Sequence, residues 1–254
     1  MAGPNMGWGL RVCVTLLRPP LMALTRRDWH GGDKLPRSGG GVIVANHISH
    51  ADPLVYAHFV YDSGRLPRFL AKAEILEVKG LKWLLSSAGQ IPVYRESRDA
   101  SVAFRAAVAA VERGECVIVY PEGTITRDPR MWPMVGKTGA ARIALKAGVQ
   151  VIPSAQWGAQ DILAPYAKKP RLLPRKTIRV RAGDPVDLDD LRSGPITPEV
   201  LREATDRIMT SITALLEEIR GESAPAVRFD PRVHKVPATG NPNRAKRARR
   251  RRGS

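Results

Sequence analysis

The sequence predicts a single α/β domain in which helices flank a central, mostly parallel or mixed sheet, preceded by an N-terminal apolar helical segment. Short apolar runs rich in Val and Ile alternate with longer segments of helical periodicity, which is the pattern of an α/β layer fold. The 254 residues, 43% of them hydrophobic, suit one such domain with a tail and exclude wholesale disorder. The chain divides into a helical segment (1–28), a domain (29–222) and a tail (223–254).

The expected elements follow one another along the chain. Strands are expected at residues 42–45, 68–71, 91–94, 116–120 and 149–156, with an edge strand at 177–181. Helices are expected at residues 52–61, 74–87, 98–113, 138–147 and 198–220. The last helix has clear ends, because Thr197 caps it, Pro198 takes its first position and Gly221 follows it.

Residues 5–27 are apolar and predict one or two short helices, broken at residues 18–20, which include two prolines. A transmembrane helix needs about 20 apolar residues, whereas only six residues separate Arg11 from Arg18. Two interpretations of this segment remain open. It packs on the domain as an ordinary helix, or it lies in the lipid headgroup layer with its arginines toward the phosphates. The second interpretation makes residues 1–28 a membrane-associating segment.

The formal net charge of +17 predicts anionic partners: a membrane surface, a phosphorylated substrate or a nucleic acid. Residues 222–254 hold ten Lys/Arg and two Asp/Glu, and the tail is expected to be disordered. A nucleic acid is disfavoured, because Phe229 is the only aromatic residue of the tail and offers no stacking platform. With only Cys13 and Cys116, the reducing cytoplasm is favoured. We expect a peripheral or monotopic protein on the cytoplasmic face of the cell membrane.

The strongest chemical signal is the sequence N-H-I-S-H-A-D at residues 46–52. A buried strand delivers His47 to its carboxyl end, where open α/β sheets usually place their ligands. Asp52 follows five residues later, and its carboxylate can hold one imidazole nitrogen while the other nitrogen takes a proton. Two other interpretations stay open at this point. Asp52 can simply cap the following helix, and His47 can satisfy a backbone carbonyl.

Three further motifs accompany this pair. In order, they are G-Q-I-P-V-Y-R at 89–95, Y-P-E-G-T at 120–124 and V-I-P at 151–153. Together with the first motif they resemble, in sequence and spacing, the four blocks of the glycerolipid acyltransferase superfamily. They are most similar to those of the 1-acylglycerol-3-phosphate acyltransferases, which make phosphatidic acid. The resemblance covers roughly residues 8–220.

The resemblance implies a role for each matching residue. His47 would be the general base and Asp52 its orienting carboxylate. The residues that it assigns to substrate binding, or to shaping the pocket, are Arg95, Glu122, Gly123, Thr124, Lys72, Lys137 and Pro153. Among them, Arg95 would bind the phosphate of the acceptor, for which a guanidinium is well shaped. One departure stands out: Ile125 occupies a position where the family often has Arg, and the basic residue comes later, at Arg127.

The implied reaction moves a fatty acyl group from acyl-CoA or acyl carrier protein to the sn-2 hydroxyl of lysophosphatidic acid, with no metal and no cofactor. His47 and His50 suggest a metal cluster only weakly, because no H-E-x-x-H helix is present. The sequence G-K-T at 136–138 resembles the end of a nucleotide-binding loop, but Met131 stands where its first Gly is required. Two alternatives remain: another acceptor, such as glycerol 3-phosphate or another lysolipid, and a catalytically inactive protein that binds membranes or nucleic acid.

Overall fold

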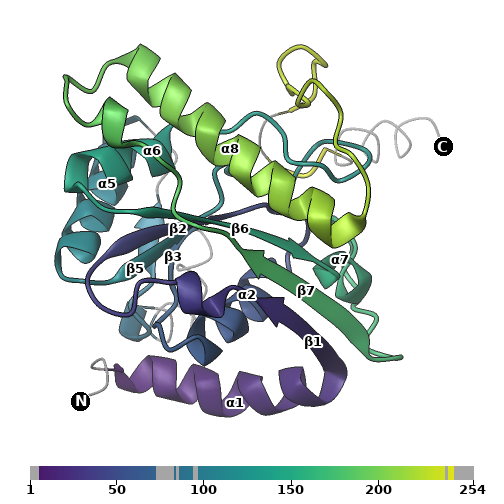
Figure 1. Ribbon diagram of the computed structural model, residues 1–254. Coiled ribbons are helices and arrows are strands. Elements are labelled where there is room, and N and C mark those ends of the chain that lie inside the picture. Colours follow the sequence, from purple (N-terminus) through teal and green to yellow (C-terminus); the bar gives the residue numbers. More distant parts are fainter. Residues whose placement is uncertain (1–5, 73–82, 84–85, 94–96, 238–239, 243–254) are drawn as a thin grey trace.

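The computed structural model describes residues 6–72, 83, 86–93, 97–237 and 240–242. Within this part of the chain, seven strands form one sheet in the order β1-β7-β6-β2-β5-β3-β4. The strands are β1 (Thr25–His30), β2 (Gly41–Ala45), β3 (Arg68–Lys72), β4 (Ile91–Val93), β5 (Cys116–Val119), β6 (Val151–Trp157) and β7 (Lys176–Ala182). Neighbouring strands are parallel except β6 and β7, which are antiparallel. The mixed-sheet α/β fold is therefore confirmed (Figure 1).

Helices cover both faces of this sheet (Figure 1). They are α1 (Trp8–Leu24), α2 (Asp52–Asp62), α5 (Ser97–Glu112), α6 (Gly139–Ala147), α7 (Ala159–Ile162) and α8 (Pro198–Arg220), with short 3₁₀ turns η1 (Gly32–Lys34) and η2 (Asp189–Leu191). Side chains of β2 alternate between the two faces of the sheet. Val42 and Val44 pack on the side of α5, α6 and α8, whereas Ile43 and Ala45 pack on the side of α2. Most of the helix expected at 74–87 lies outside the described residues.

The first strand, β1, has no counterpart among the expected elements. Its sequence, T-R-R-D-W-H, lacks the apolar alternation of a strand. It is held by parallel pairing with β7 and by charge, because Asp28 accepts a hydrogen bond from Arg181 (3.1 Å) and lies 3.5 Å from Arg179. Consequently β7, which the sequence predicts as an edge strand, lies inside the sheet between β1 and β6. The expected domain boundary at residue 28 also falls within β1.

The N-terminal segment forms one helix, α1, where the sequence predicts a break at the prolines. The helix runs through Pro19 and Pro20. Two prolines remove two N–H groups, which would otherwise bond to carbonyls one turn earlier. Those carbonyls belong to Thr15 and Leu16, which are exposed, so that water can satisfy them and the helix continues.

Residues 224–237 pack on the domain, although the sequence predicts disorder for the whole tail. Arg228 forms an ion pair with Asp206 of α8, and the carbonyl of Phe229 accepts a backbone N–H from the loop before α6 at 3.0 Å. The side chain of Arg228 and the backbone of Phe229 therefore find partners on the domain. The last residues of the chain, 243–254, lie outside the described residues.

Candidate active site

Asn46 comes directly after the central strand β2 and ties it to β6. Its Nδ2 donates to the backbone carbonyl of Gln156 (3.1 Å), and the backbone N–H of Gln156 donates to its Oδ1 (2.8 Å). The side-chain amide of Gln156 also donates to the carbonyl of Asn46 (3.1 Å). These bonds extend the pairing of β2 with β6 by one step, so the chain is free to turn away at the next residue. No sequence motif marks Gln156, which lies in an ordinary buried strand.

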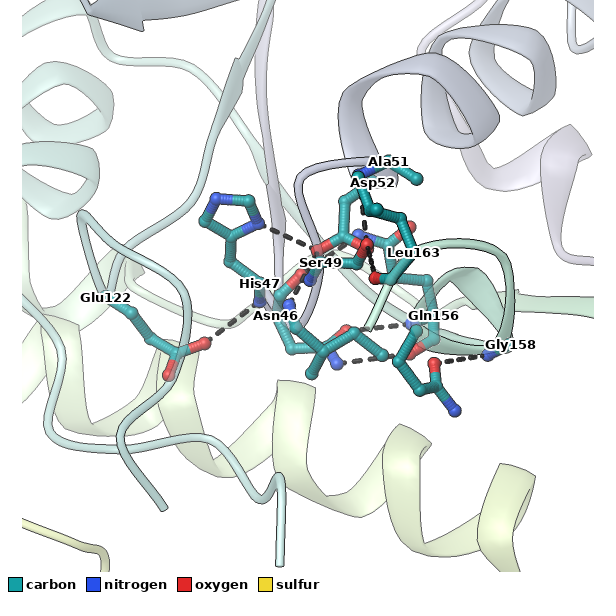
Figure 2. Close-up of polar contacts among 11 residues, drawn as sticks. Asn46, His47, Ser49, Ala51, Asp52, Glu122, Gln156, Gly158 and Leu163 are labelled. Atoms are coloured by element: carbon teal, nitrogen blue, oxygen red, sulfur yellow. Dashed lines mark hydrogen bonds and ion pairs between the residues drawn. The ribbon is translucent and has the colours of Figure 1, made fainter. Parts of the chain in front are cut away.

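The structure brings His47 and Asp52 together, with the imidazole turned toward the start of α2 (Figure 2). His47 Nδ1 lies 2.7 Å from Asp52 Oδ2, and since a carboxylate can only accept, Nδ1 carries the proton. The same oxygen accepts the backbone N–H groups of Ile48 (2.6 Å) and Ser49 (2.9 Å). Asp52 is not the cap of α2, because the N-cap is Ala51 and no side chain caps this helix.

The imidazole is fixed in its plane by a stack of rings. The His47 ring lies 4.4 Å from that of Tyr120 at an interplanar angle of 15°, and Tyr120 stacks in turn on Phe69. The Asp52 side chain is fully buried, whereas that of His47 is 15% exposed. No residue that the structure describes forms a hydrogen bond with His47 Nε2, so this nitrogen is available to take a proton.

Glu122 ties the loop after β5 to the backbone of His47 (Figure 2). Its Oε1 accepts the backbone N–H of His47 at 3.0 Å, and its Oε2 accepts that of Met134 at 3.1 Å. The backbone N–H of Thr126 donates to the carbonyl of His47 at 2.8 Å. Burial raises the pKa of Glu122 to about 8, against the two backbone hydrogen bonds, which lower it. Both carboxyl oxygens thus accept hydrogen bonds from backbone N–H groups.

Gly123 and Lys137 lie against each other at the turn that follows Glu122. Gly123 has φ +67°, in the left-handed region that favours glycine, and a Cβ there would lie 2.8 Å from Lys137 Nζ. The backbone N–H of Lys137 donates to the carbonyl of Pro121 at 2.8 Å. Thr124, the next residue of the turn, is half-buried. The structure thus gathers these predicted residues beside the loop that carries His47.

The remaining predicted residues are Pro153, Lys72 and Arg95. Pro153 is buried within β6 and pairs with Val44 of β2, so it belongs to the sheet below the site. Lys72 is the last residue of β3, and its side chain, like the whole of Arg95, lies outside the described residues.

Arg127 is bound within the protein. Its guanidinium is buried, with Nε donating to the carbonyl of Pro237 (3.0 Å) and Nη2 to that of Gly240 (2.6 Å). Its third nitrogen, Nη1, donates to the hydroxyl of Tyr166. This arginine therefore holds the C-terminal segment on the domain, and Lys137 is the cation that the structure places at the Gly123 turn.

The arrangement can serve as a general-base site. A histidine is oriented by a buried carboxylate, has its second nitrogen free, and lies at the carboxyl edge of the sheet, where it can activate a hydroxyl group. Within the described ranges, no three His, Cys, Asp or Glu residues lie close enough to hold a metal ion.

Comparison with known proteins defines the class. The model of the Acyltransferase family matches residues 26–157, more than half of the chain, so this chain belongs to that family. The matched region contains His47, Asp52 and Glu122.

Several relatives share this region. A chloroplastic 1-acyl-sn-glycerol-3-phosphate acyltransferase from Brassica napus is 31% identical over 140 residues, 54% of this chain and 39% of that protein. A 1-acyl-sn-glycerol-3-phosphate acyltransferase from Borreliella burgdorferi is 32% identical over 126 residues, 48% of each chain. A lyso-ornithine lipid O-acyltransferase from Pseudomonas aeruginosa is 33% identical over 128 residues, 48% of this chain and 46% of that protein. The match thus spans less than half of each relative.

A solved structure shares the fold. The crystal structure of the 1-acyl-sn-glycerophosphate (LPA) acyltransferase PlsC from Thermotoga maritima superimposes with a TM-score of 0.63 and 23% identity. The superposition covers 85% of this chain and 81% of that one.

Proposed function

We propose that this chain is an O-acyltransferase that moves a fatty acyl group from acyl-CoA or acyl carrier protein to the sn-2 hydroxyl of lysophosphatidic acid, giving phosphatidic acid. The observation that carries the proposal is the 2.7 Å contact between His47 Nδ1 and Asp52 Oδ2, which leaves Nε2 as a base. Family membership supports acyl transfer, and the names of the Brassica and Borreliella relatives support the acceptor.

The reaction needs one displacement. His47 Nε2 removes the proton of the acceptor hydroxyl as that oxygen attacks the thioester carbonyl, and the Asp52 carboxylate stabilises the imidazolium that forms. The tetrahedral intermediate collapses with cleavage of the carbon–sulfur bond. The proton on Nε2 passes to the leaving thiolate, so the products are an ester and a free thiol and His47 is again neutral. General-base catalysis of this kind contributes about 10²–10⁴-fold to the rate.

The acceptor phosphate is proposed to bind on the β5–β3–β4 side of His47. Lys137 lies at the turn of residues 122–124 after β5. In the chain, Lys72 ends β3 and Arg95 comes two residues after β4. Lysine and arginine bind phosphate through charge-assisted hydrogen bonds, which are stronger than neutral ones.

A membrane surface is proposed as the place where the enzyme meets its lipid. The helix α1 exposes Leu16 (65%), Leu17 (40%) and Met22 (37%) to solvent, with Arg11 also exposed. In the described part of the chain, no helix has the length and apolar character needed to cross a bilayer. Apolar side chains with arginines beside them suit a helix that lies in the headgroup layer. The proposed location is the cytoplasmic face of the cell membrane, with peripheral attachment.

A second candidate acceptor is a lysolipid whose headgroup lacks phosphate. One relative is named as a lyso-ornithine lipid O-acyltransferase, and an ornithine headgroup carries no phosphate. In addition, Ile125 occupies the position of the family's arginine, and the guanidinium of Arg127 is bound within the protein.

An acceptor panel tests the proposal. Purified protein is incubated with palmitoyl-CoA and, separately, with lysophosphatidic acid, glycerol 3-phosphate, lysophosphatidylcholine or lyso-ornithine lipid, and the products are identified by mass spectrometry. We expect phosphatidic acid to form fastest, and to be lost in His47→Ala. A preference for lyso-ornithine lipid would favour the second candidate. If neither acyl-CoA nor acyl carrier protein donates an acyl group to any acceptor, we would conclude that the chain is a catalytically inactive binding protein.

A further inference from the structure

A basic loop, residues 163–171, packs on the loop that carries His47. The basic loop follows α7, which comes after β6, and β6 is a parallel neighbour of β2. These two strands therefore end at the same edge of the sheet. Ser49 Oγ donates to the carbonyl of Leu163 at 2.6 Å, and the His50 and Tyr166 rings meet edge-on with centroids 5.6 Å apart.

The basic loop lines a pocket of about 570 Å³, within the range of about 300–1,000 Å³ that is usual for small-molecule sites. Its cations are Lys168, Lys169 and Arg171. Among the residues that the structure describes, no carboxylate forms an ion pair with any of the three. Three uncompensated positive charges around one pocket favour a ligand that carries several negative charges.

The inner wall of this pocket is held in place. Tyr166 lines it with φ +60°, a backbone conformation that is uncommon for a residue other than glycine. The hydroxyl of Tyr166 accepts a hydrogen bond from Arg127, whose guanidinium lies 5.1 Å from the ring centroid. Arg127 is anchored in turn by two carbonyls of the C-terminal segment. A fourth positive charge is thus fixed behind the pocket wall.

The pocket and the proposed acceptor site lie on opposite sides of the central strand. The sheet order places β6 on one side of β2 and β5, β3 and β4 on the other. The Gly123 turn and Lys137 belong to the β5 side, and the basic loop belongs to the β6 side. His47, at the end of β2, lies between them. A second substrate with an anionic part can therefore reach His47 from the β6 side.

We infer that the basic-loop pocket binds the phosphorylated nucleotide end of an acyl-CoA donor, an inference that rests on the proposed acyltransferase function. Coenzyme A carries a 3′-phosphate and a diphosphate at one end, and its thioester lies at the far end of a long pantetheine arm. In the protein, the charged pocket and the proposed base are likewise separate, because the pocket wall contacts His50 rather than His47. Acyl carrier protein presents the same arm without the nucleotide, so the inference selects acyl-CoA as the donor.

Two charge-removing variants test this inference. The pocket variant carries Lys168→Ala, Lys169→Ala and Arg171→Ala. The control variant carries Arg105→Ala, Arg113→Ala and Lys146→Ala, which removes the same charge from exposed positions on and beside α5 and α6. Equal thermal melting of wild type and both variants shows that all three proteins are folded.

The donors are palmitoyl-CoA and palmitoyl-pantetheine, which shares the thioester and the arm but lacks the nucleotide. The pocket variant is expected to raise the KM for palmitoyl-CoA by about tenfold or more, since charged hydrogen bonds are lost. It leaves the KM values for palmitoyl-pantetheine and lysophosphatidic acid unchanged, and the control variant leaves all three unchanged. Equal losses with the two donors would overturn the inference. A rise in KM confined to lysophosphatidic acid would also overturn it, as would a loss confined to the binding of anionic vesicles. Either result would assign the pocket to a lipid headgroup.

Direct binding separates this inference from the proposed function, because it requires no turnover. Titration calorimetry with coenzyme A and with adenosine 3′,5′-bisphosphate is expected to show binding to wild type and about tenfold weaker binding to the pocket variant. Unchanged binding in the pocket variant would overturn the inference. If coenzyme A binds as expected while lysophosphatidic acid is not acylated, the pocket assignment stands and the acceptor assignment fails.

Discussion

The Oε1 atom of Glu122 lies 3.0 Å from the backbone nitrogen of His47, so a buried carboxyl group holds the main chain of the proposed base. The second oxygen of the same carboxyl group accepts the N–H of Met134. The family resemblance implies that Glu122 is a substrate-binding residue. With both oxygens bound to backbone, its position is better suited to fixing the loop of His47 than to contacting a substrate. We therefore propose Glu122 as a positioning residue.

Glu122→Gln should change how stability depends on pH. Glutamate titrates near pH 4.3 in an unfolded chain, whereas burial raises the pKa of Glu122 to about 8. The folded state keeps a proton that the unfolded state loses, so this contribution is full below about pH 4.3 and is lost as the pH rises to about 8. The slope approaches 1.4 kcal/mol per pH unit, an order-of-magnitude value. The free energy of unfolding of wild type, relative to the variant, should fall across this window in urea denaturation. Parallel pH profiles for the two proteins would contradict it.

His47→Ala and Asp52→Asn should both remove most activity while the protein stays folded. Loss of the base is expected to lower kcat by about 10²–10⁴-fold. Asn at position 52 can still accept the N–H groups of Ile48 and Ser49, but it lacks the charge that stabilises an imidazolium. It also places an amide nitrogen near the position of Asp52 Oδ1, which is buried without a hydrogen-bond partner among the described residues. Turnover is measured with palmitoyl-CoA and lysophosphatidic acid, and thermal melting shows that the variants are folded. Near-normal kcat in His47→Ala would exclude the proposed mechanism.

The sequence could predict the pair His47 and Asp52 because both residues lie in one short segment between a strand and a helix. Their contact depends on local spacing alone. Gln156 and Met134 could not be predicted in the same way. Gln156 is 110 residues from its partner Asn46, and Met134 contributes only a backbone N–H, which any residue except proline can supply. Supporting contacts of this kind depend on tertiary arrangement rather than on a motif.

The fold, too, has elements that the sequence could predict and elements that it could not. Strands with a continuous apolar run were predictable to within a residue or two, as for β2 at Gly41–Ala45. The polar strand β1 was not, because its pairing with β7 and the charge pairs of Asp28 stabilise it instead of apolar burial. The same holds for the C-terminal segment, where partners such as Asp206 for Arg228 lie on another element. Local periodicity carries no signal for charge pairs between distant segments.

Arg95→Ala should weaken binding of the acceptor more than binding of the donor. If Arg95 holds the phosphate, its loss costs about 1.5–3 kcal/mol, which raises the apparent KM for lysophosphatidic acid roughly tenfold to a hundredfold. The KM for palmitoyl-CoA should change much less. Arg105→Ala, on the exposed side of α5, is the matched control and should leave both values unchanged. Equal effects of Arg95→Ala on both substrates would remove this residue from the acceptor site.

Removal of residues 243–254 should weaken membrane binding only at low salt. This stretch holds seven Lys/Arg and no Asp/Glu, and each basic residue near an anionic surface contributes about 1 kcal/mol. Exposed charge is screened over about 8 Å at physiological ionic strength. The truncation spares residues 224–237, which pack on the domain. Co-sedimentation with anionic vesicles across a salt series measures binding. Loss of activity on detergent-dispersed substrate would instead make this stretch part of the catalytic unit.

Replacement of exposed apolar side chains on α1 should weaken membrane binding at every salt concentration. The variant carries Leu16→Ser, Leu17→Ser and Met22→Ser, at positions that are 65%, 40% and 37% exposed. Apolar burial contributes about 25 cal/mol per Å² removed from water, and salt screens it little, in contrast to charge. Activity on detergent-dispersed substrate should stay near normal, whereas use of a vesicle-embedded acceptor should fall. Val233→Ser, at a position that is 73% exposed in the C-terminal segment, is the control and should bind vesicles as wild type does. If the α1 variant still bound vesicles like wild type in high salt, α1 would be an ordinary packed helix, and the proposed membrane attachment would have to rest on charge alone.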